Sequence, residues 1–182
     1  MQVGRATWVL IVLLGAWASA ASAQNQVNDR FDVRIASDIA RQVDGYAQYS
    51  IFDHVSGIVD NGVVTLVGKV TMPYKKMDIG RRAQQVAGVR ELRNNIEVLS
   101  VSPYDEELRL RIARAIYGNS AFWQYGARAN PPIHIIVDRG HVTLVGVVSS
   151  NVDRMLARSL ATGFGELSVT NDLRTDAEMR SE

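Results

Sequence analysis

The sequence predicts an α+β protein of two tandem αββαβ modules, each a small mixed sheet with two helices packed on one face. Two observations lead to this fold class. The stretch at residues 60–70 recurs at residues 138–148 with Asp, Gly, Val, Thr, Leu, Val, Gly and Val at matching positions. Self-similarity on this scale indicates that one small module is used twice. Helical patterns of apolar residues also precede and follow each repeated stretch.

Residues 1–23 are predicted to be a cleavable signal peptide. Arg5 precedes an apolar run at residues 8–17, and residues 21–23, Ala-Ser-Ala, have the small side chains of a cleavage site. The run is shorter than the roughly 20 residues that a membrane span needs, so an uncleaved anchor is the weaker alternative. We therefore expect a soluble, exported mature chain that starts at Gln24.

The composition argues against several partners and modifications. The chain has 20 Lys and Arg against 19 Asp and Glu, and loss of Arg5 with the signal peptide leaves a formally neutral mature chain. A neutral, exported chain is not expected to bind nucleic acid, or to bind membranes by charge alone. The chain has no cysteine, so it is expected neither to be a lipoprotein nor to contain disulfides.

Module one is expected over residues 29–99. Four apolar residues at helical spacing predict a first helix that begins near Asp29 and ends at Gly45: Phe31, Ile35, Ile39 and Val43. Two strands should follow at residues 52–59 and 63–70. Pro73 then begins a second helix. Met77, Ala83 and Val86 are expected to face inward on that helix, which ends at Gly88. The third strand is expected to contain Val89, Leu92, Asn94, Ile96 and Val98, with Asn94 facing inward.

A short linker at residues 100–103 leads to module two, which is expected over residues 104–175. The core residues of its first helix are Leu108, Ile112 and Ile116. Strands at residues 133–137 and 142–148 follow, then a helix with Met155, Leu156 and Leu160, and a last strand with Val169, Asn171 and Leu173. Residues 176–182 are polar and are expected to be a flexible tail.

The repeated stretches are predicted to be β-hairpins. Asn61-Gly62 suits a two-residue turn in which both residues have positive φ, and Arg139-Gly140 is a poorer version of it. The turns set two cross-strand pairs, Val59 with Val64 and Val137 with Val142. Each second strand has a glycine in its middle, Gly68 or Gly146, which weakens a sheet unless another element comes close there. We interpret these glycines as points where helices cross the sheet.

The repeats also resemble a known family. Two Gly-x-Val-Thr-Leu-x-Gly-x-Val cores, at residues 62–70 and 140–148, each precede a helix and a closing strand. The closing motifs are Gly88, Val89 and Asn94 in module one, and Gly165 and Asn171 in module two. Behind a signal peptide, this order resembles the BON-domain proteins (bacterial osmotically inducible and nodulation domain) over nearly all of residues 29–175. Module two departs from the pattern with Glu166 where Val is expected.

The resemblance implies a non-enzymatic periplasmic protein with two tandem BON domains. Such a protein associates with phospholipid surfaces and supports envelope integrity, often under osmotic stress. The family offers no common catalytic residue, and no cofactor is expected. An anionic phospholipid membrane surface is the expected partner, with an envelope protein as a second one. The alternative function is a periplasmic protein–protein interaction adaptor or a holdase-like chaperone.

The first helix of module two carries a candidate contact surface. Leu110, Ala113 and Tyr117 form a second apolar stripe nearly opposite the core stripe, with arginines around it and aromatic residues just beyond. Aromatic rings beside arginine suit the headgroup boundary of a membrane. The expected lipid or partner contacts are Leu110, Arg111, Arg114, Tyr117, Phe122, Trp123 and Tyr125. Packing of this stripe against module one is the alternative.

A secondary basic patch is expected on the second helix of module one. Lys75, Lys76, Arg81 and Arg82 form the densest cluster of cations in the sequence, and such a cluster suits anionic headgroups. A solvated helix face, with Asp78 paired to Arg82, is the alternative interpretation.

Neither a metal site nor a catalytic site is expected. The hairpin register separates His134 from His141 by roughly 13 Å, too far for one metal ion, and His54 belongs to the other module. Asn94 and Asn171 are interpreted as structural residues that satisfy neighbouring backbone groups. The sequence contains no nucleophile with an adjacent base and no phosphate-binding glycine loop.

The outer faces of both predicted sheets are more apolar than solvent exposure favours. Either the two modules pack together there or the protein self-associates. The apolar residues on these faces are Ile58, Val63, Val67, Ile136, Val145 and Val147.

Overall fold

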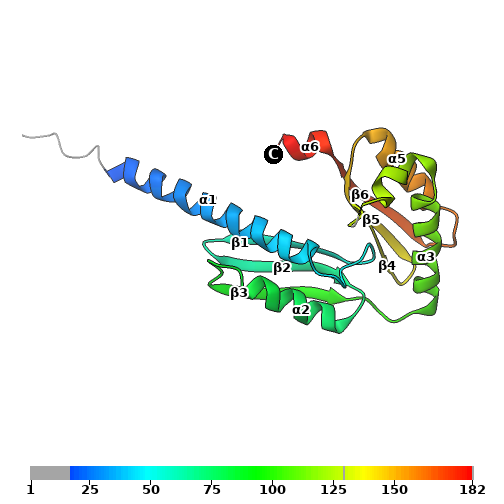
Figure 1. Ribbon diagram of the computed structural model, residues 1–182, viewed down its shortest axis with the longest axis horizontal. Helices are drawn as coiled ribbons and strands as arrows, with labels where there is room; N and C mark the ends of the chain where they lie inside the picture. Colours follow the sequence, from blue (N-terminus) through cyan, green and yellow to red (C-terminus); the bar gives the residue numbers. More distant parts are fainter. Residues whose placement is uncertain (1–16, 129, 182) are drawn as a thin grey trace, which may run out of the picture.

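The computed structural model describes residues 17–128 and 130–181, with side chains from residue 28 onward (Figure 1). It contains two three-stranded mixed sheets in the orders β1-β2-β3 and β4-β5-β6. In each sheet the first two strands are antiparallel and the last two are parallel. This arrangement confirms the two tandem αββαβ modules.

The elements follow the predicted order. Module one consists of α1 (Trp17–Asp44), β1 (His54–Asp60), β2 (Val63–Val70), α2 (Pro73–Gln84) and β3 (Glu91–Val98). Module two consists of α3 (Pro103–Tyr117), the 3-10 turn η1 (Ser120–Phe122), α4 (Trp123–Gly126), β4 (Ile133–Asp138), β5 (His141–Val148), α5 (Asn151–Leu160), β6 (Ser168–Thr175) and α6 (Asp176–Arg180).

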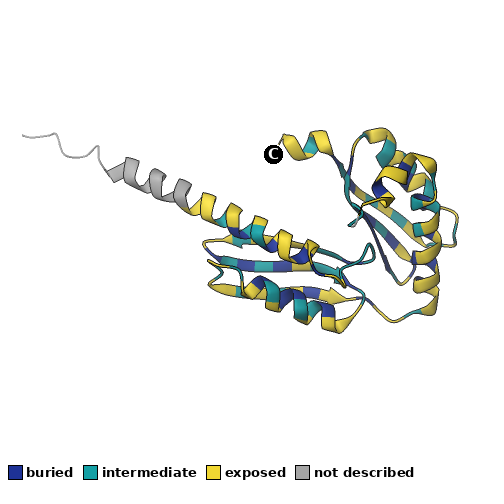
Figure 2. Ribbon diagram, viewed as in Figure 1, coloured by how far each residue is buried: buried dark blue, intermediate teal, exposed yellow. Residues whose placement is uncertain are grey.

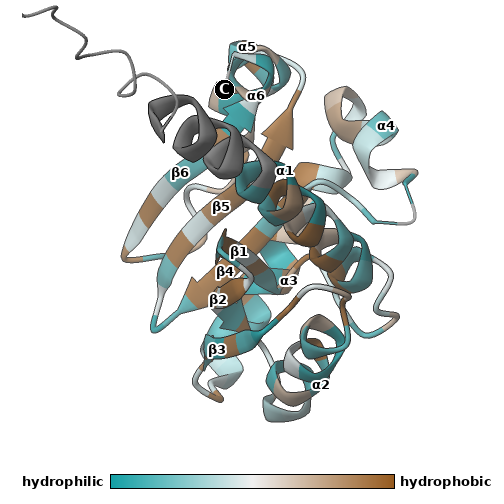
Figure 3. Ribbon diagram, turned by 90° about the vertical axis from the view of Figure 1, so that its left-hand side faces the viewer, coloured by the Kyte–Doolittle hydropathy of each residue, from teal (hydrophilic) through white to brown (hydrophobic). Residues whose placement is uncertain are grey.

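Each module has its own hydrophobic core between the sheet and its helices. Buried residues lie on the strands and on the helix faces that meet them, while the outer helix faces are exposed (Figure 2). Hydropathy follows the same division, with apolar residues along β5 and polar residues on α5 (Figure 3). The largest fully buried side chains include Leu66, Ile79 and Ile96 in module one and Leu108, Ile112, Phe122 and Leu144 in module two.

The hairpin geometry agrees with the prediction. Val59 pairs with Val64, and Val137 pairs with Val142. Both residues of each turn have positive φ: Asn61 at 49°, Gly62 at 76°, Arg139 at 53° and Gly140 at 78°.

The two mid-strand glycines have a different cause from the one predicted. A Cβ at Gly68 would lie 2.1 Å from the carbonyl oxygen of His54, and one at Gly146 would lie 1.8 Å from that of Pro132. Their φ angles are 133° and 128°, a region that L side chains rarely adopt. The close neighbour is therefore the backbone at the start of the adjacent strand rather than a helix, and the interpretation as helix crossing points is wrong.

Both ends of the chain differ from expectation. Helix α1 begins at Trp17 instead of near Asp29, so Asp29 is not its cap. The signal-peptide prediction falls largely on residues 1–16, which lie outside the described part. At the other end, the expected flexible tail forms helix α6, because Thr175 and Glu178 make a reciprocal capping box and Arg154 pairs with Glu178 at 3.0 Å.

The two modules pack against each other at one corner. The segment between α1 and β1, residues 45–53, will be called the α1–β1 loop. The carbonyl oxygen of Ile51 in this loop accepts a hydrogen bond from the backbone N of Ile135 in β4, at 2.7 Å. Lys69 of β2 forms an ion pair with Asp138 of β4 at 2.6 Å. Ile136 is buried, whereas Ile58 on the outer face of module one is 69 % exposed.

Candidate functional site

A groove of about 560 Å³ lies between α3 and the α1–β1 loop of module one. The predicted second stripe lines it, together with two apolar side chains of the α1–β1 loop. The lining residues are Ile51, Phe52, Leu110, Ala113, Arg114, Tyr117 and Gly118. The second apolar stripe of α3 therefore packs against module one, as the alternative interpretation expected. The packing is incomplete, because Leu110 remains 39 % exposed. The groove is apolar and open to solvent along part of α3.

Tyr117 forms the inner wall of this groove. Its hydroxyl donates to the carbonyl oxygen of Ile133 at 2.5 Å and accepts from the backbone N of Ile133 at 3.2 Å. Burial raises the pKa of the Tyr117 hydroxyl, and the hydrogen bond with Ile133 only partly offsets this effect. These contacts fix the ring, so Tyr117 is a structural support of the groove rather than a free contact residue.

The aromatic residues after α3 divide into two buried rings and one exposed ring. Phe122 is completely buried and Tyr125 is 2 % exposed, both in the core of module two. The Tyr125 hydroxyl also hydrogen-bonds with Ser149 Oγ at 2.8 Å and donates to Asp153 at 2.9 Å. The expectation that these two residues contact lipid is therefore wrong. Trp123 is 75 % exposed, but it is not part of the groove lining.

The arginines of α3 have distinct environments. Arg109 is buried and donates to the carbonyl oxygen of Val137 at 2.8 Å, so it links α3 to β4. The guanidinium of Arg111 lies 5.2 Å from the centroid of the Phe164 ring. Arg114 is exposed and forms no ion pair within the described residues. The rim of the groove thus carries an unpaired cation.

The expected basic patch on α2 is only partly available. Lys75 is 6 % exposed and forms an ion pair with Asp53 at 2.6 Å, so it is not a surface cation. Arg82 lies 4.8 Å above the ring of Tyr46, and Asp78 pairs with Arg81 rather than Arg82. Lys76 is half-buried. Met77, expected in the core, is 60 % exposed on the same helix.

The buried carboxylate of Asp53 holds the α1–β1 loop on module one. It accepts hydrogen bonds from Ser50 N and Oγ and from Thr71 N and Oγ1, in addition to Lys75. Burial alone would raise the pKa of Asp53, but the hydrogen bonds from Lys75, Thr71 and Ser50 outweigh it and hold this pKa below its ordinary value. The carboxylate is therefore charged in the native state.

The asparagines of the closing strands connect strand and helix in both modules. Asn94 Nδ2 donates to the carbonyl oxygen of Lys76 in α2, and Asn171 Nδ2 donates to that of Arg154 in α5, each at 2.9 Å. Gly88 and Gly165, ahead of these strands, have φ of 98° and 96°. All four residues have structural roles.

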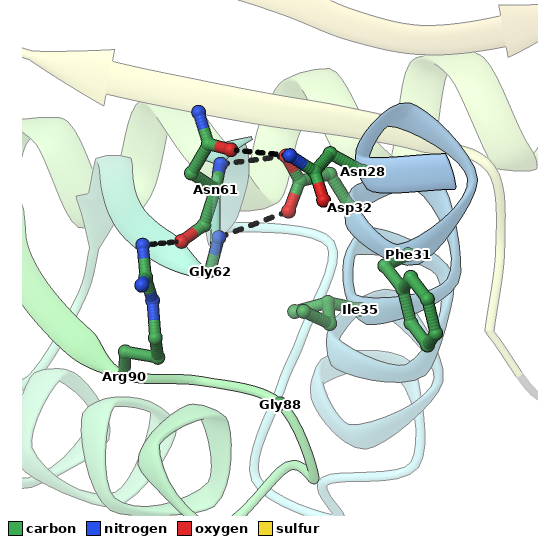
Figure 4. Close-up of a pocket in the computed structure, with 8 residues that line it drawn as sticks. All are labelled: Asn28, Phe31, Asp32, Ile35, Asn61, Gly62, Gly88 and Arg90. Carbon is green, nitrogen blue, oxygen red and sulfur yellow. Dashed lines mark hydrogen bonds between the residues drawn. The ribbon is translucent and has the colours of Figure 1, made fainter. Parts of the chain in front are cut away.

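Two aspartates that were not predicted hold the hairpin turns: Asp32 in module one and Asp105 in module two. The carboxylate of Asp32 in α1 accepts from the backbone N of Asn61 at 2.6 Å and of Gly62 at 2.9 Å (Figure 4). Arg90 also donates to the carbonyl oxygen of Asn61. These residues line a shallow pocket of about 290 Å³ whose polar groups are already paired with one another.

The structure brings together two histidines that the sequence assigned to separate modules. The rings of His54 and His134 are 6.1 Å apart between centroids, and His134 Nδ1 lies 2.6 Å from the carbonyl oxygen of Asp53. Burial lowers the pKa of both histidines. Within the part of the chain that the structure describes, no group of three or more metal-ligating side chains is found.

Comparison with known proteins identifies the family. The BON domain matches residues 51–100 and 105–177, one match in each module. The chain belongs to the BON-domain family. Two tandem BON domains are thus shown, and BON domains are generally non-catalytic modules with membrane- or protein-associated roles. No curated protein matches the chain.

Two solved structures show a distant likeness to this BON-domain chain. One is CdsD, a structural protein of the type III secretion system of Chlamydia trachomatis, with 14% identity, a TM-score of 0.27, and coverage of 80% of this chain and 94% of that one. The other is the C-terminal domain of CdsD, with 11% identity, a TM-score of 0.26, and coverage of 75% and 96%. These TM-scores are too low for the likeness to bear on function.

Proposed function

We propose that this BON-domain protein is a non-enzymatic component of the periplasm that associates with anionic phospholipid surfaces and supports envelope integrity under osmotic stress. Module two makes the contact, through the groove along α3. The observation that carries the proposal is an apolar groove, with exposed Leu110 inside it and the unpaired guanidinium of Arg114 at its rim. Apolar surface beside a cation is the combination that an anionic headgroup and its acyl chains would recognise.

Trp123 lies at the exposed edge of the same module. The residue is 75 % exposed at the start of α4, which follows α3 after the 3-10 turn η1. An exposed indole is favourable at the boundary between headgroups and acyl chains, because its ring is apolar and its N–H remains hydrated. Trp123 is therefore included in the proposed contact surface, although it does not line the groove.

A periplasmic location requires export of the chain. We propose that the signal peptide is cleaved near Ala23, which would remove residues 17–23 of α1 with it. No helix within the described residues has the length and apolar character to cross a membrane. Mass spectrometry of fractionated cells should find a periplasmic species that starts at Gln24. An intact species beginning at Met1 and held in the inner membrane would contradict this location.

Vesicle flotation tests the lipid contact. The mature chain should float with phosphatidylglycerol vesicles and less with phosphatidylcholine vesicles. The variant Leu110→Ser with Arg114→Gln should float less, because it removes both the apolar and the cationic component of the groove while changing only exposed side chains. The matched control is Met77→Ser with Arg81→Gln, an exposed apolar residue and an exposed cation on α2.

Tryptophan fluorescence gives a second readout. Of the three tryptophans, Trp8 and Trp17 precede the predicted cleavage site, so Trp123 alone reports in the mature chain. Its emission should shift to shorter wavelength when anionic vesicles are added.

Loss of flotation in the α2 control instead of the α3 variant would move the site to α2. A parent chain that does not float would overturn the proposal.

A further inference from the structure

The edge of β4 in module two is covered by a segment of module one. Ile135 in the middle of β4 donates its backbone N–H to the carbonyl oxygen of Ile51, at 2.7 Å. Ile51 and Phe52 also pack against the core of module two and line the groove beside α3. The space between the first helix and the first strand of module two is therefore partly filled by polypeptide, through one backbone hydrogen bond and two apolar side chains.

The corresponding edge in module one is open at Gly57, whereas the backbone N of Val55 at the start of the same edge donates to the Tyr49 hydroxyl at 3.1 Å. The hairpin repeat aligns Gly57 of β1 with Ile135 of β4: Gly57 pairs with Leu66, and Ile135 pairs with the equivalent Leu144. The N–H of Ile135 points away from its own sheet, so the N–H of Gly57 in the same register does so too. Among the described residues, no hydrogen bond from outside the sheet reaches the backbone of Gly57.

A groove of about 150 Å³ lies beside this open edge, between α1 and β1. The groove exists because the side chains at three of its lining positions are small: Ala36 and Ala40 on the helix, and Gly57 on the strand. Its apolar walls are formed by Ile39, Val43, Val55, Val59 and Leu66. Ala40 and Gly57 are exposed, so the groove is accessible from solvent.

The sequence of β1 lacks the usual protection of an edge strand. Natural edge strands are protected by charged side chains, proline, bulges or a covering element. The opposite edge of the same sheet, β3, carries Glu91, Arg93 and Glu97. Residues 54–59 of β1 contain no Asp, Glu, Lys, Arg or proline, and Ile58 is 69 % exposed on the outer face. An unprotected edge beside an apolar groove is the surface that strand addition uses.

We propose that the open edge of β1 binds an extended segment of a partner polypeptide, which pairs with β1 through Gly57 and places an apolar side chain in the α1–β1 groove. In module two of this chain, Ile51 and Phe52 already occupy the equivalent position at the edge of β4. A polypeptide segment with apolar side chains therefore fits beside the first strand of such a module. Asp44 lines the groove and Asp60 ends the strand, so the segment carries a basic residue at each end. This site is separate from the proposed lipid contact on α3.

NMR of the 15N-labelled mature chain tests the site directly. The probe is the synthetic peptide Lys-Thr-Val-Thr-Val-Lys, and the control peptide is Lys-Thr-Pro-Thr-Pro-Lys, which keeps the charges but cannot donate backbone hydrogen bonds from its prolines. The probe should shift the Gly57 amide resonance saturably and slow its hydrogen exchange. The proline peptide should do neither. An unmoved Gly57 resonance, or a shift at Ile135 in its place, would overturn the proposal.

Two tryptophan substitutions on α1 form a matched pair for the same probe. Ala40→Trp fills the groove and should weaken peptide binding about tenfold or more, the effect of blocking one apolar pocket. Gln42→Trp places the same ring at an exposed position outside the lining and should leave binding unchanged. Equal peptide affinity in Ala40→Trp and the parent chain would contradict the site, and the Gly57 resonance in the parent chain decides the matter even where a variant fails to fold.

Discussion

The carboxylate of Asp105 in α3 accepts a hydrogen bond from the backbone N of Gly140 at the tip of the β4–β5 hairpin, at 2.8 Å. Its other oxygen accepts from the backbone N of Arg139, also at 2.8 Å. Asp32 makes the same pair of contacts in module one. In both modules, one aspartate of the first helix therefore fixes the hairpin turn.

Asp105→Ala should destabilise the protein more than Asp32→Ala. Asp105 is 1 % exposed and Gly140 is buried, so removal of this carboxylate leaves the Gly140 amide without a partner in a place that water does not reach. Hydrogen bonds to charged groups are worth about 1.5–3 kcal/mol, and we expect a loss of about 3 kcal/mol in the free energy of unfolding. Asp32 is half-exposed and Asn61 is exposed, so water can replace the lost contacts and the loss should be about 1 kcal/mol. Urea denaturation of both variants measures the difference, and equal losses would contradict this explanation.

The fold could be predicted because its signals are local. The repeated hairpin residues specify turn and register, and apolar spacing specifies the helices. Asp32 and Asp105 were missed although a signal exists: each lies three residues before an apolar core residue, Ile35 or Leu108. Aligning the first helices, in addition to the hairpins, would have revealed the pair.

The candidate site was harder to predict because burial depends on contacts between distant segments. Phe122 and Trp123 are adjacent in sequence, yet one is buried and the other exposed, since a short helical turn directs them to opposite sides. Lys75 belongs to an exposed-looking basic cluster, but Asp53 lies next to it across the fold. Neither outcome leaves a periodic pattern in the sequence.

Gly146→Ala should cost much more than an ordinary glycine substitution. The added Cβ would meet the carbonyl oxygen of Pro132 at 1.8 Å, and the residue would be held at a φ of 128°. Backbone strain and steric overlap together should lower the free energy of unfolding by about 2–4 kcal/mol. The control is Gly163→Ala, where φ is 96° but nothing lies within 4 Å of the new Cβ, so only about 1 kcal/mol is expected. Similar melting temperatures for the two variants would argue against the clash.

Lys75→Met should strongly destabilise module one. It leaves the carboxylate of Asp53, which is fully buried, without its cation, and breaking a buried ion pair costs about 3–5 kcal/mol. Adding Asp53→Asn should restore part of the loss, because the remaining buried group is then neutral. Denaturant unfolding of both single variants and the double variant measures this coupling. A double variant less stable than Lys75→Met would contradict the ion-pair explanation.

The same pair predicts a dependence on acid. The pKa of Asp53 lies below its ordinary value of 3.8 in the native state, so its contribution to stability is complete above about pH 4 and is lost as pH falls through the lower native pKa. The stability difference between the parent chain and Lys75→Met should therefore narrow below about pH 4, where the carboxylate becomes protonated. If the stability difference between the two proteins stays constant down to pH 2, protonation of Asp53 is not the cause of the loss of stability in acid.

His134 should make the module contact sensitive to mild acid. Burial lowers the pKa of His134, although the carbonyl oxygens of Asp53 and Ser50 and the charges of Asp44 and Asp53 act in the opposite direction. Tyr49 and His54 also face the ring, with centroids at 5.4 Å and 6.1 Å.

A histidine whose native pKa lies below the unfolded value of about 6.5 binds its proton more readily in the unfolded chain. Its stabilising effect is therefore complete above about pH 6.5 and is lost as pH falls toward the native pKa. The free energy of unfolding should be lower at pH 5.5 than at pH 7.5, by at most about 1.4 kcal/mol for each affected histidine per pH unit.

His134→Asn should flatten this pH dependence of the free energy of unfolding, since the amide can donate to the carbonyl oxygen of Asp53 without titrating. A slope that survives in His134→Asn would assign the pH dependence to His54, whose pKa is lowered by burial and by the nearby His134.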